Sequence, residues 1–178
     1  MRKILIILSL VFFGIMAGAQ PLKLQIAESS MKISGTSSLH DWTSDVEEYE
    51  AQAILADTRI ADIQFIAKVK SIKSGKSGMD NNTYKALNES EYPDISFTSA
   101  ELTIEGDKLV GYGQLTIAGK TRRIPLNLTL DNNSKISVKG EVQVKMTDYG
   151  ISPPTAVFGT IKTGDDITIL FDFTLNKS

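Results

Sequence analysis

The sequence predicts an all-β protein with one or two short helices, whose antiparallel strands close into a barrel. Short runs in which every second residue is apolar recur between residues 22 and 175, and polar turn sequences separate them. Helical spacing is confined to one segment, and no repeat or linker divides the chain. About eight to ten strands with one apolar face each must curl or stack to bury that face. Closure into a barrel does this without leaving exposed edges.

The first 19 residues have the pattern of a cleaved export signal. Arg2 and Lys3 precede an apolar run at 4–16, and the small residues Ala17, Gly18 and Ala19 fit a signal peptidase site. The apolar run is shorter than the roughly 20 residues that span a bilayer, which disfavours the alternative of a retained anchor. We therefore expect a domain at residues 20–178 without an integral membrane span, exported to the periplasm or secreted.

The composition of residues 20–178 bounds the class of protein. The length suits a single domain with a substantial core. Acidic residues outnumber basic ones, so nothing suggests nucleic acid as a partner. The chain has no cysteine, so an exported domain would depend on packing and sheet hydrogen bonds rather than disulfides.

In the first half of this domain we expect strands at 22–26, 31–33, 49–55 and 63–69, with a polar and aromatic loop at 36–43. Helical spacing from Met79 to Leu87 predicts a short helix at about 79–88, with Ser77 and Asp80 as possible caps and Pro93 ending the segment. Alternation at 95–104 changes phase, which indicates a bulge. Another strand covers 109–117, and a tight turn follows at 118–120.

The second half is dominated by a hairpin at 121–146. Apolar residues fill every second position on both sides of the turn sequence 131–134. We expect Leu130 to face Ile136, Leu128 to face Val138, Leu126 to face Gly140 and Ile124 to face Val142. Pro125 donates no hydrogen bond, and so predicts a bulge or a locally unpaired edge.

A loop is expected at 148–154, with a turn of helix near 155–158. Asp165 and Asp166 are interpreted as a turn before the last strand, 167–175.

An ordered set of motifs covers nearly the whole domain. The motifs are GTSSLHDW at 35–42, IKSG at 72–75, MD at 79–80, YKAL at 84–87, YPDISF at 92–97, GQLTIAGKTR at 113–122 and DYGISPP at 148–154. Together they resemble the YceI-like family of exported, lipocalin-like polyisoprenoid-binding proteins. The resemblance implies an up-and-down, lipocalin-like antiparallel barrel of about eight strands. It also implies an apolar interior that holds a long isoprenoid tail, such as that of a quinone or polyprenol.

The residues themselves also suggest a container. An eight-stranded barrel is either just filled by side chains or holds one small ligand. Aliphatic side chains of modest size, together with Gly111, Gly113 and Gly140 on strands, favour a hollow interior. The candidate ligand-binding residues of the lumen and mouth are His40, Trp42, Phe65, Phe97, Leu115, Ile117, Leu126, Leu128, Val138, Val142, Val144, Phe171 and Phe173.

The polar candidates each have a structural alternative. His40, the only histidine, could bond a ligand head group at the barrel mouth, or be a loop residue satisfied by local backbone. Trp42 could close one end of the barrel or simply belong to the core. Lys68, Lys70, Lys73 and Lys76 could meet a lipid diphosphate, but a solvated outer strand face is the favoured explanation. One of Arg122 and Arg123 should point inward or toward a carboxylate near the rim of the barrel, and the sequence does not say which.

No pattern indicates catalysis. The chain lacks a cysteine nucleophile, and its lone histidine has no partners for a triad or a metal site. The sequence Gly111-Tyr112-Gly113 lies within a strand rather than before a helix, so a phosphate loop is disfavoured. We expect no cofactor apart from a bound isoprenoid lipid or quinone. The alternatives are a filled barrel acting in envelope interactions or stress without a lipid, and an enzyme using His40. A homodimer remains open.

Overall fold

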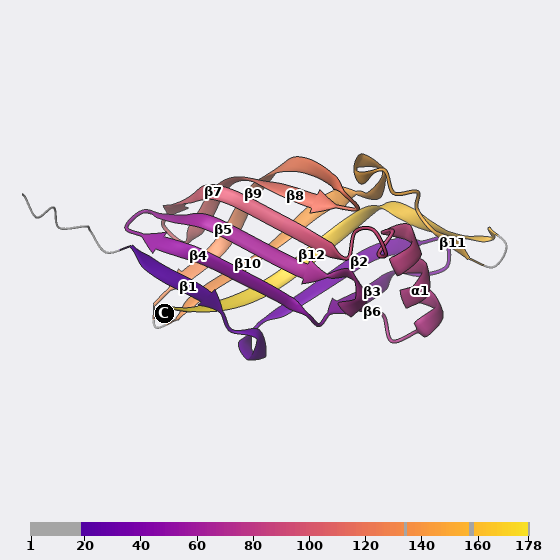
Figure 1. Ribbon diagram of the computed structural model, residues 1–178, viewed down its shortest axis with the longest axis horizontal. Coiled ribbons are helices and arrows are strands. Elements are labelled where there is room, and N and C mark those ends of the chain that lie inside the picture. Colours follow the sequence, from indigo (N-terminus) through magenta and orange to yellow (C-terminus); the bar gives the residue numbers. More distant parts are fainter. Residues whose placement is uncertain (1–18, 134, 157–158, 178) are drawn as a thin grey trace, which may run out of the picture.

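The computed structural model describes residues 19–133, 135–156 and 159–177 (Figure 1). Most of the expected export signal, residues 1–18, lies outside the described residues. The strands are β1 (Gln20–Leu24), β2 (Ser30–Ser37), β3 (Trp42–Val46), β4 (Tyr49–Ala56), β5 (Arg59–Lys68), β6 (Ile72–Lys73), β7 (Asp94–Glu105), β8 (Lys108–Ile117), β9 (Lys120–Asn132), β10 (Ile136–Lys145), β11 (Thr155–Ala156) and β12 (Ile161–Lys177). The helix α1 spans Ser77–Ala86, and 3-10 helices span Ile26–Glu28, Val69–Ser71 and Met146–Tyr149.

The sheet closes on itself because β1 pairs with both β4 and β12. Three staves of the barrel each consist of two consecutive strands. β1 and β2 both pair with β12, β3 is followed by β4 in the next stave, and β6 follows β5 and pairs with β3. Eight strand positions therefore run round the barrel in chain order, and every pairing is antiparallel. The expected class, an all-β, up-and-down, lipocalin-like barrel with short helices, is confirmed.

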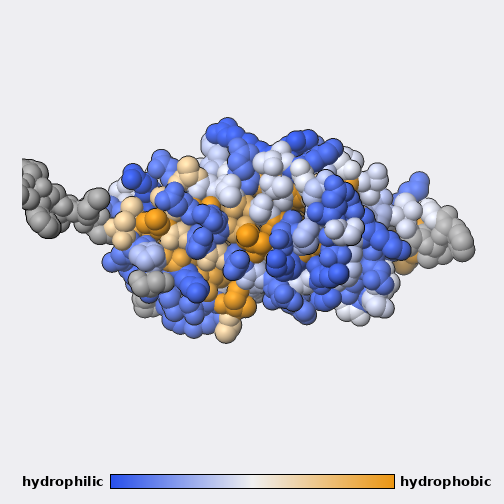
Figure 2. All heavy atoms as spheres, in the orientation of Figure 1, coloured by the Kyte–Doolittle hydropathy of each residue, from blue (hydrophilic) through white to orange (hydrophobic). Residues whose placement is uncertain are grey.

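The two ends of the barrel differ. One end of the barrel, which we call the terminal end, carries both termini of the described chain: the start of β1 and the end of β12 (Figure 1). The turns after β4, β7 and β9 lie at the same end. The other end, the helix end, carries α1 and the loop between β2 and β3 (Figure 1). The alternating strands place apolar side chains inside, and the surface is largely hydrophilic, with a few hydrophobic patches on the viewed face (Figure 2).

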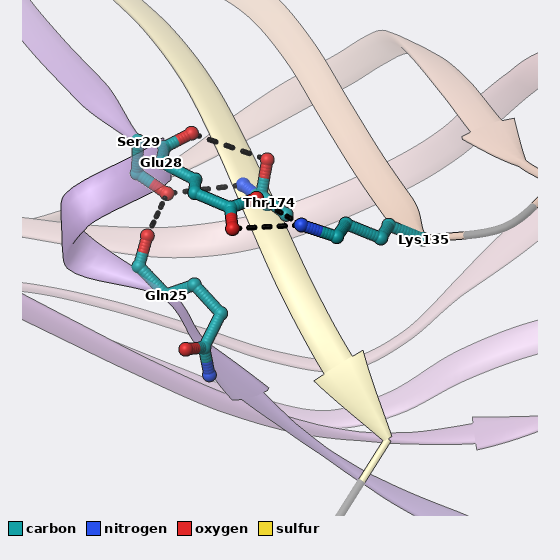
Figure 3. Close-up of polar contacts among 5 residues, drawn as sticks. All are labelled: Gln25, Glu28, Ser29, Lys135 and Thr174. Carbon is teal, nitrogen blue, oxygen red and sulfur yellow. Dashed lines mark hydrogen bonds and ion pairs between the residues drawn. The ribbon is translucent and has the colours of Figure 1, made fainter.

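Side-chain bonds hold the break between β1 and β2 against β12 (Figure 3). The Ser29 hydroxyl donates to the Gln25 carbonyl at 2.7 Å and accepts the backbone N–H of Thr174 at 3.0 Å. The Thr174 hydroxyl donates to the Glu28 carbonyl, and the Lys135 ammonium forms an ion pair with the Glu28 carboxylate at 2.6 Å. The break is therefore a fixed part of the wall.

The helix α1 begins two residues before the expected position and ends at Ala86. Neither expected cap acts as one, because the N-cap is Lys76 and no side chain caps it. Instead Asp80 accepts bonds from the backbone N–H and hydroxyl of Ser74, at 2.8 and 2.6 Å. The Tyr84 hydroxyl lies 2.9 Å from the Lys70 carbonyl oxygen, in the 3-10 helix before β6, and 3.0 Å from that of Ile72 in β6, which ties α1 to the barrel.

The expected register of the long hairpin is wrong by two residues. Asn132 faces Ile136 and Leu130 faces Val138, because β9 continues through Asp131 and Asn132 and the turn is shorter than expected. A shift of two keeps every side chain on its own face, so the apolar faces still coincide. The bulge expected in β7 is confirmed as a register shift against β8 between Thr98 and Leu102.

The pairing between β9 and β10 ends early. It extends only from Asn132–Ile136 to Thr129–Lys139, whereas β9 pairs with β8 from Lys120 to Thr129. Residues 120–128 of β9 and 140–145 of β10 thus have no ladder between them, and we call this gap the β9/β10 seam. Pro125 lies within it, so the unpaired edge that this proline predicts is confirmed.

Two expectations near the C-terminus are wrong. Residues 155 and 156 form β11 rather than a turn of helix, and the helical turn is Met146–Tyr149; residues 157 and 158 lie outside the described residues. Asp165 and Asp166 lie within β12, at an irregularity in its pairing with β2, instead of in a turn. Asp165 accepts bonds from the backbone N–H and hydroxyl of Thr147, which lower the pKa of its carboxyl.

Candidate functional site

The barrel encloses a cavity of about 140 Å³. Inward-facing aliphatic and aromatic side chains make up its wall. The exception among the lining residues is Gln52, which lies between Ala51 and Ala53 on β4. Gln52 is exposed and its amide donates to Gln64 at 3.1 Å, so its side chain points outward and only its backbone can border the cavity. The site therefore offers apolar contacts and no buried charge.

Nine of the thirteen candidate residues line this cavity. They are Phe65, Phe97, Leu115, Leu126, Leu128, Val138, Val142, Phe171 and Phe173. Ile117 and Val144 share the inward face of their strands but lie closer to the helix end and are not part of the lining. His40 and Trp42 also lie away from it, in and after the loop between β2 and β3.

The candidate list omitted further lining residues on the same strands and on strands near the N-terminus. These are Leu22, Met31, Ala51, Ala53, Ile60, Ile63, Ile95, Leu102, Leu109, Ile124, Ile169 and Leu175. The period-two pattern placed most of them on inward faces, so extending that pattern to every strand would have found them. The alanines carried no such signal, because a small side chain is common on either face.

A cluster of aromatic rings fills one side of the barrel interior. The ring centroids of Phe171 and Phe173 lie 4.9 Å apart, Phe65 stacks on Phe173 at 5.7 Å, and Tyr49 lies 5.5 Å from Phe173. Phe171 and Phe173 point inward yet remain only partly buried, because they border the cavity. Burial raises the pKa of the Tyr49 phenol, which is neutral at ordinary pH. Rotation of these rings would change the volume of the cavity.

The three strand glycines do not leave empty space, contrary to expectation. A Cβ at Gly113 would overlap the ring of Phe97, one at Gly111 would lie 2.8 Å from a methyl of Leu102, and one at Gly140 would overlap Leu128. Each glycine instead lets a larger side chain from a neighbouring strand lie flat against the wall. The rings and branched side chains thus take up room at the wall rather than at the centre of the barrel.

His40 and Trp42 are held by local bonds. The His40 ring is exposed, and its Nδ1 lies 2.6 Å from the carbonyl oxygen of Asp41. The Trp42 indole N–H donates to the Thr36 carbonyl at 3.1 Å, and the ring packs over Gly35. The His40 contact matches the alternative of a loop residue that bonds local backbone, and the Trp42 contacts fix the indole against β2.

The lysine string is mostly paired on the surface. Lys68 forms an ion pair with Asp94 at 2.8 Å and Lys70 with Glu89 at 3.2 Å, while Lys73 donates to the Tyr84 hydroxyl. Among the described residues, no group of three or more histidine, aspartate or glutamate side chains is arranged to hold a metal ion. No helix in the same ranges has the length and apolar character needed to cross a membrane.

The two adjacent arginines point to opposite faces of β9. Arg123 lies on the outside, with its guanidinium carbon 3.7 Å from the centre of the Tyr112 ring. Arg122 pairs with Leu115, a cavity residue, and so belongs to the inward face. The sequence predicted one inward arginine, and the register identifies it.

Comparison with known proteins agrees with this architecture. The structure is similar to BcnA of Burkholderia cenocepacia, with a TM-score of 0.72 and 17% identity over 85% of this chain and 98% of that one. It is also similar to a polyisoprenoid binding domain from Saccharophagus degradans implicated in plant cell wall breakdown, with a TM-score of 0.66 and 12% identity over 88% and 98% of the two chains. The YceI protein of Campylobacter jejuni aligns with a TM-score of 0.63 and 21% identity over 76% and 85%.

At these identities the solved structures share the fold of this chain and say nothing further about it. A search of curated proteins found no match. The profile of the YceI-like domain matches residues 22–175, which is nearly all of the described barrel. The chain therefore belongs to the family of YceI-like domain proteins.

Proposed function

We propose that this protein binds a long apolar lipid of the isoprenoid or quinone type inside its barrel, as a carrier or store without catalysis. The observation that carries the proposal is the cavity, whose inward-facing side chains are aliphatic or aromatic. Its lining extends along β7 from Ile95 to Leu102, about 23 Å at ~3.3 Å per residue. A cavity extended in this way suits a chain better than a compact molecule. The polyisoprenoid binding domain of Saccharophagus degradans, which shares the fold, supports the same ligand class.

The protein would act in the cell envelope. The sequence at residues 1–19 supports export to the periplasm or beyond, and an apolar lipid in an aqueous compartment needs a protein interior to shield it. We assign no catalytic step, because the described polar side chains near the cavity form no acid–base or nucleophilic pair.

One observation favours the alternative of a filled barrel without a lipid. A cavity of about 140 Å³ is smaller than the roughly 300–1,000 Å³ of most ligand pockets. It resembles an engineered cavity of about 150 Å³ that binds benzene. A long lipid chain could therefore enter only if Phe171, Phe173 and their neighbours move aside. In a filled barrel without a lipid, these side chains stay in place.

Ala53→Leu distinguishes the two. The new side chain would enter the cavity and displace the volume of about three methylenes of ligand, worth about 2 kcal/mol, or more than a tenfold rise in Kd for geranylgeraniol. Ala61→Leu, on the outer face of β5, is the matched control and should leave the Kd unchanged. The proposal is wrong if protein purified from its native host yields no apolar lipid by mass spectrometry and geranylgeraniol does not bind in vitro.

A further inference from the structure

The β9/β10 seam brings the cavity next to a part of the wall without backbone bonds. Ile124 and Leu126 on β9 and Val142 on β10 line the cavity and border the seam. Among the described residues, residues 120–128 and residues 140–145 form no ladder pair with one another. The break between β1 and β2, by contrast, is bridged by the bonds of Figure 3. An apolar chain could thus pass between β9 and β10 by moving side chains alone.

Two cations lie at the helix end of this seam. Lys120 and Arg122 occupy alternate positions on the inward face of β9, in step with Ile124. Arg122 remains exposed despite its inward position. Within the described ranges, neither side chain forms an ion pair with a carboxylate. The Arg122 guanidinium donates only to the neighbouring Thr121 carbonyl.

A buried phenol without a partner lies beside these cations. The 3-10 helix Met146–Tyr149 packs against β9 and β10, and Tyr149 is only 2% exposed. Its hydroxyl forms no hydrogen bond to any described residue. The Lys120 ammonium lies against Gly150, where a Cβ would overlap it.

The charges around the phenol are of both signs. Burial raises the pKa of Tyr149, the positive charge of Arg122 lowers it, and the carboxylate of Asp148 raises it. The phenol therefore lies within the electrostatic reach of Arg122.

We propose that the β9/β10 seam binds the anionic head group of an amphiphile, a phosphate or a carboxylate, through Arg122, Lys120 and the Tyr149 hydroxyl. The apolar chain then passes between Ile124 and Val142 into the cavity. This rests on the proposed function and narrows its ligand class to lipids with a charged head. It also places the head group at the side of the barrel, away from His40.

The test compares three ligands with the same C15 chain: farnesyl phosphate, farnesoic acid and farnesol. Kd values for the wild type and its variants are measured by competition with a fluorescent fatty-chain probe. We expect the wild type to prefer one or both anions over farnesol by about tenfold or more, the contribution of one charge-assisted hydrogen bond. The preference should weaken as salt rises, because the site is partly exposed. A preference for phosphate over carboxylate, or the reverse, identifies the head group.

Arg122→Gln should abolish most of the preference and leave farnesol binding unchanged. Arg123→Gln is the matched control, since it removes the same charge from the outer face of the next residue. Tyr149→Phe should reduce anion binding without disturbing the packing of the ring. Equal binding of anions and farnesol, or equal effects of the two arginine variants, would overturn the head-group site and leave a neutral-lipid carrier intact. If none of the three ligands binds, both proposals fail.

Discussion

Gly113 is the position where a single methyl group should test the packing of the barrel wall. A Cβ there would overlap two atoms of the Phe97 ring and lie 2.9 Å from the Thr98 carbonyl oxygen, against at least 3.4 Å for ordinary contact. The ring can rotate, but the carbonyl belongs to the backbone of β7 and must shift by about half an ångström. We expect Gly113→Ala to destabilise the protein by about 1–3 kcal/mol, the usual cost of overpacking. This corresponds to a fall in Tm of roughly 2–12 °C for a domain of this size.

A second substitution separates the ring from the backbone. Phe97→Leu removes the overlapping ring atoms, so Gly113→Ala should cost less in the Phe97→Leu background, with a coupling energy of about 0.5–3 kcal/mol. Urea unfolding followed by circular dichroism gives the four free energies of the cycle. A Gly113→Ala protein as stable as the wild type, or a cost that Phe97→Leu does not reduce, would refute the account of this glycine.

Three further predictions concern stability. Ser29→Ala should cost about 1–2 kcal/mol, because the backbone N–H of Thr174 loses its acceptor. Tyr149→Phe should stabilise the ligand-free protein by about 1 kcal/mol, because it removes a buried hydroxyl without a partner among the described residues. Bonds from Ser74 lower the pKa of Asp80, so that carboxylate stabilises the fold above its ordinary pKa of 3.8 and ceases to do so as the pH falls through the lowered value. The stability difference between the wild type and Asp80→Asn should therefore be constant near neutral pH and shrink on acidification below 3.8.

Each of these variants has a matched control, and urea unfolding measures all of them. Ser30→Ala removes an exposed hydroxyl and Tyr112→Phe an exposed phenol, so both should change stability by less than about 0.5 kcal/mol. Asp107→Asn removes a carboxyl from an exposed turn and should change stability at pH 7 by less than about 0.5 kcal/mol. A Tyr149→Phe variant less stable than the wild type would mean that its hydroxyl is satisfied, and would weaken the head-group site as well.

Period-two alternation was sufficient to predict the barrel and much of its lining. The alternation assigns residues such as Leu115 and Val142 to the inward face of their strands, whatever residues they pair with on the neighbouring strand. The register itself was wrong, since a shift of two leaves the pattern of faces unchanged and Asp131 and Asn132 can extend a strand as well as turn it. The break between β1 and β2 was anticipated, since the expected strands 22–26 and 31–33 are separate. The bonds that fix it had no signal, because they join residues about 145 apart in sequence.

The sequence could not show whether the barrel is hollow. The free volume depends on how side chains from one strand lie over glycines of the next strand, as Phe97 does over Gly113. Which residues meet in this way is set by the register between strands, and the apolar alternation does not give the register. The side of β9 on which Arg122 lies was left undecided, although Arg122 is two residues from Ile124 and the alternation alone assigns it to the inward face. The β8 pairing, which sets Leu115 opposite Arg122, agrees with that assignment.

The same glycines bear on how this small cavity would admit the long ligand that we propose. Because Phe97, Leu102 and Leu128 occupy the places where glycine has no Cβ, the free volume is set by side-chain rotamers and not by the backbone. Rotamer changes leave the sheet hydrogen bonds intact, and the β9/β10 seam gives a route that breaks none. Binding should then stabilise the closed barrel by about 2.7 kcal/mol at a ligand concentration of 100 Kd, a rise in Tm of roughly 5–11 °C. The Ala53→Leu protein should lose most of this rise while folding normally, and an equal rise in that variant would place the ligand outside the cavity.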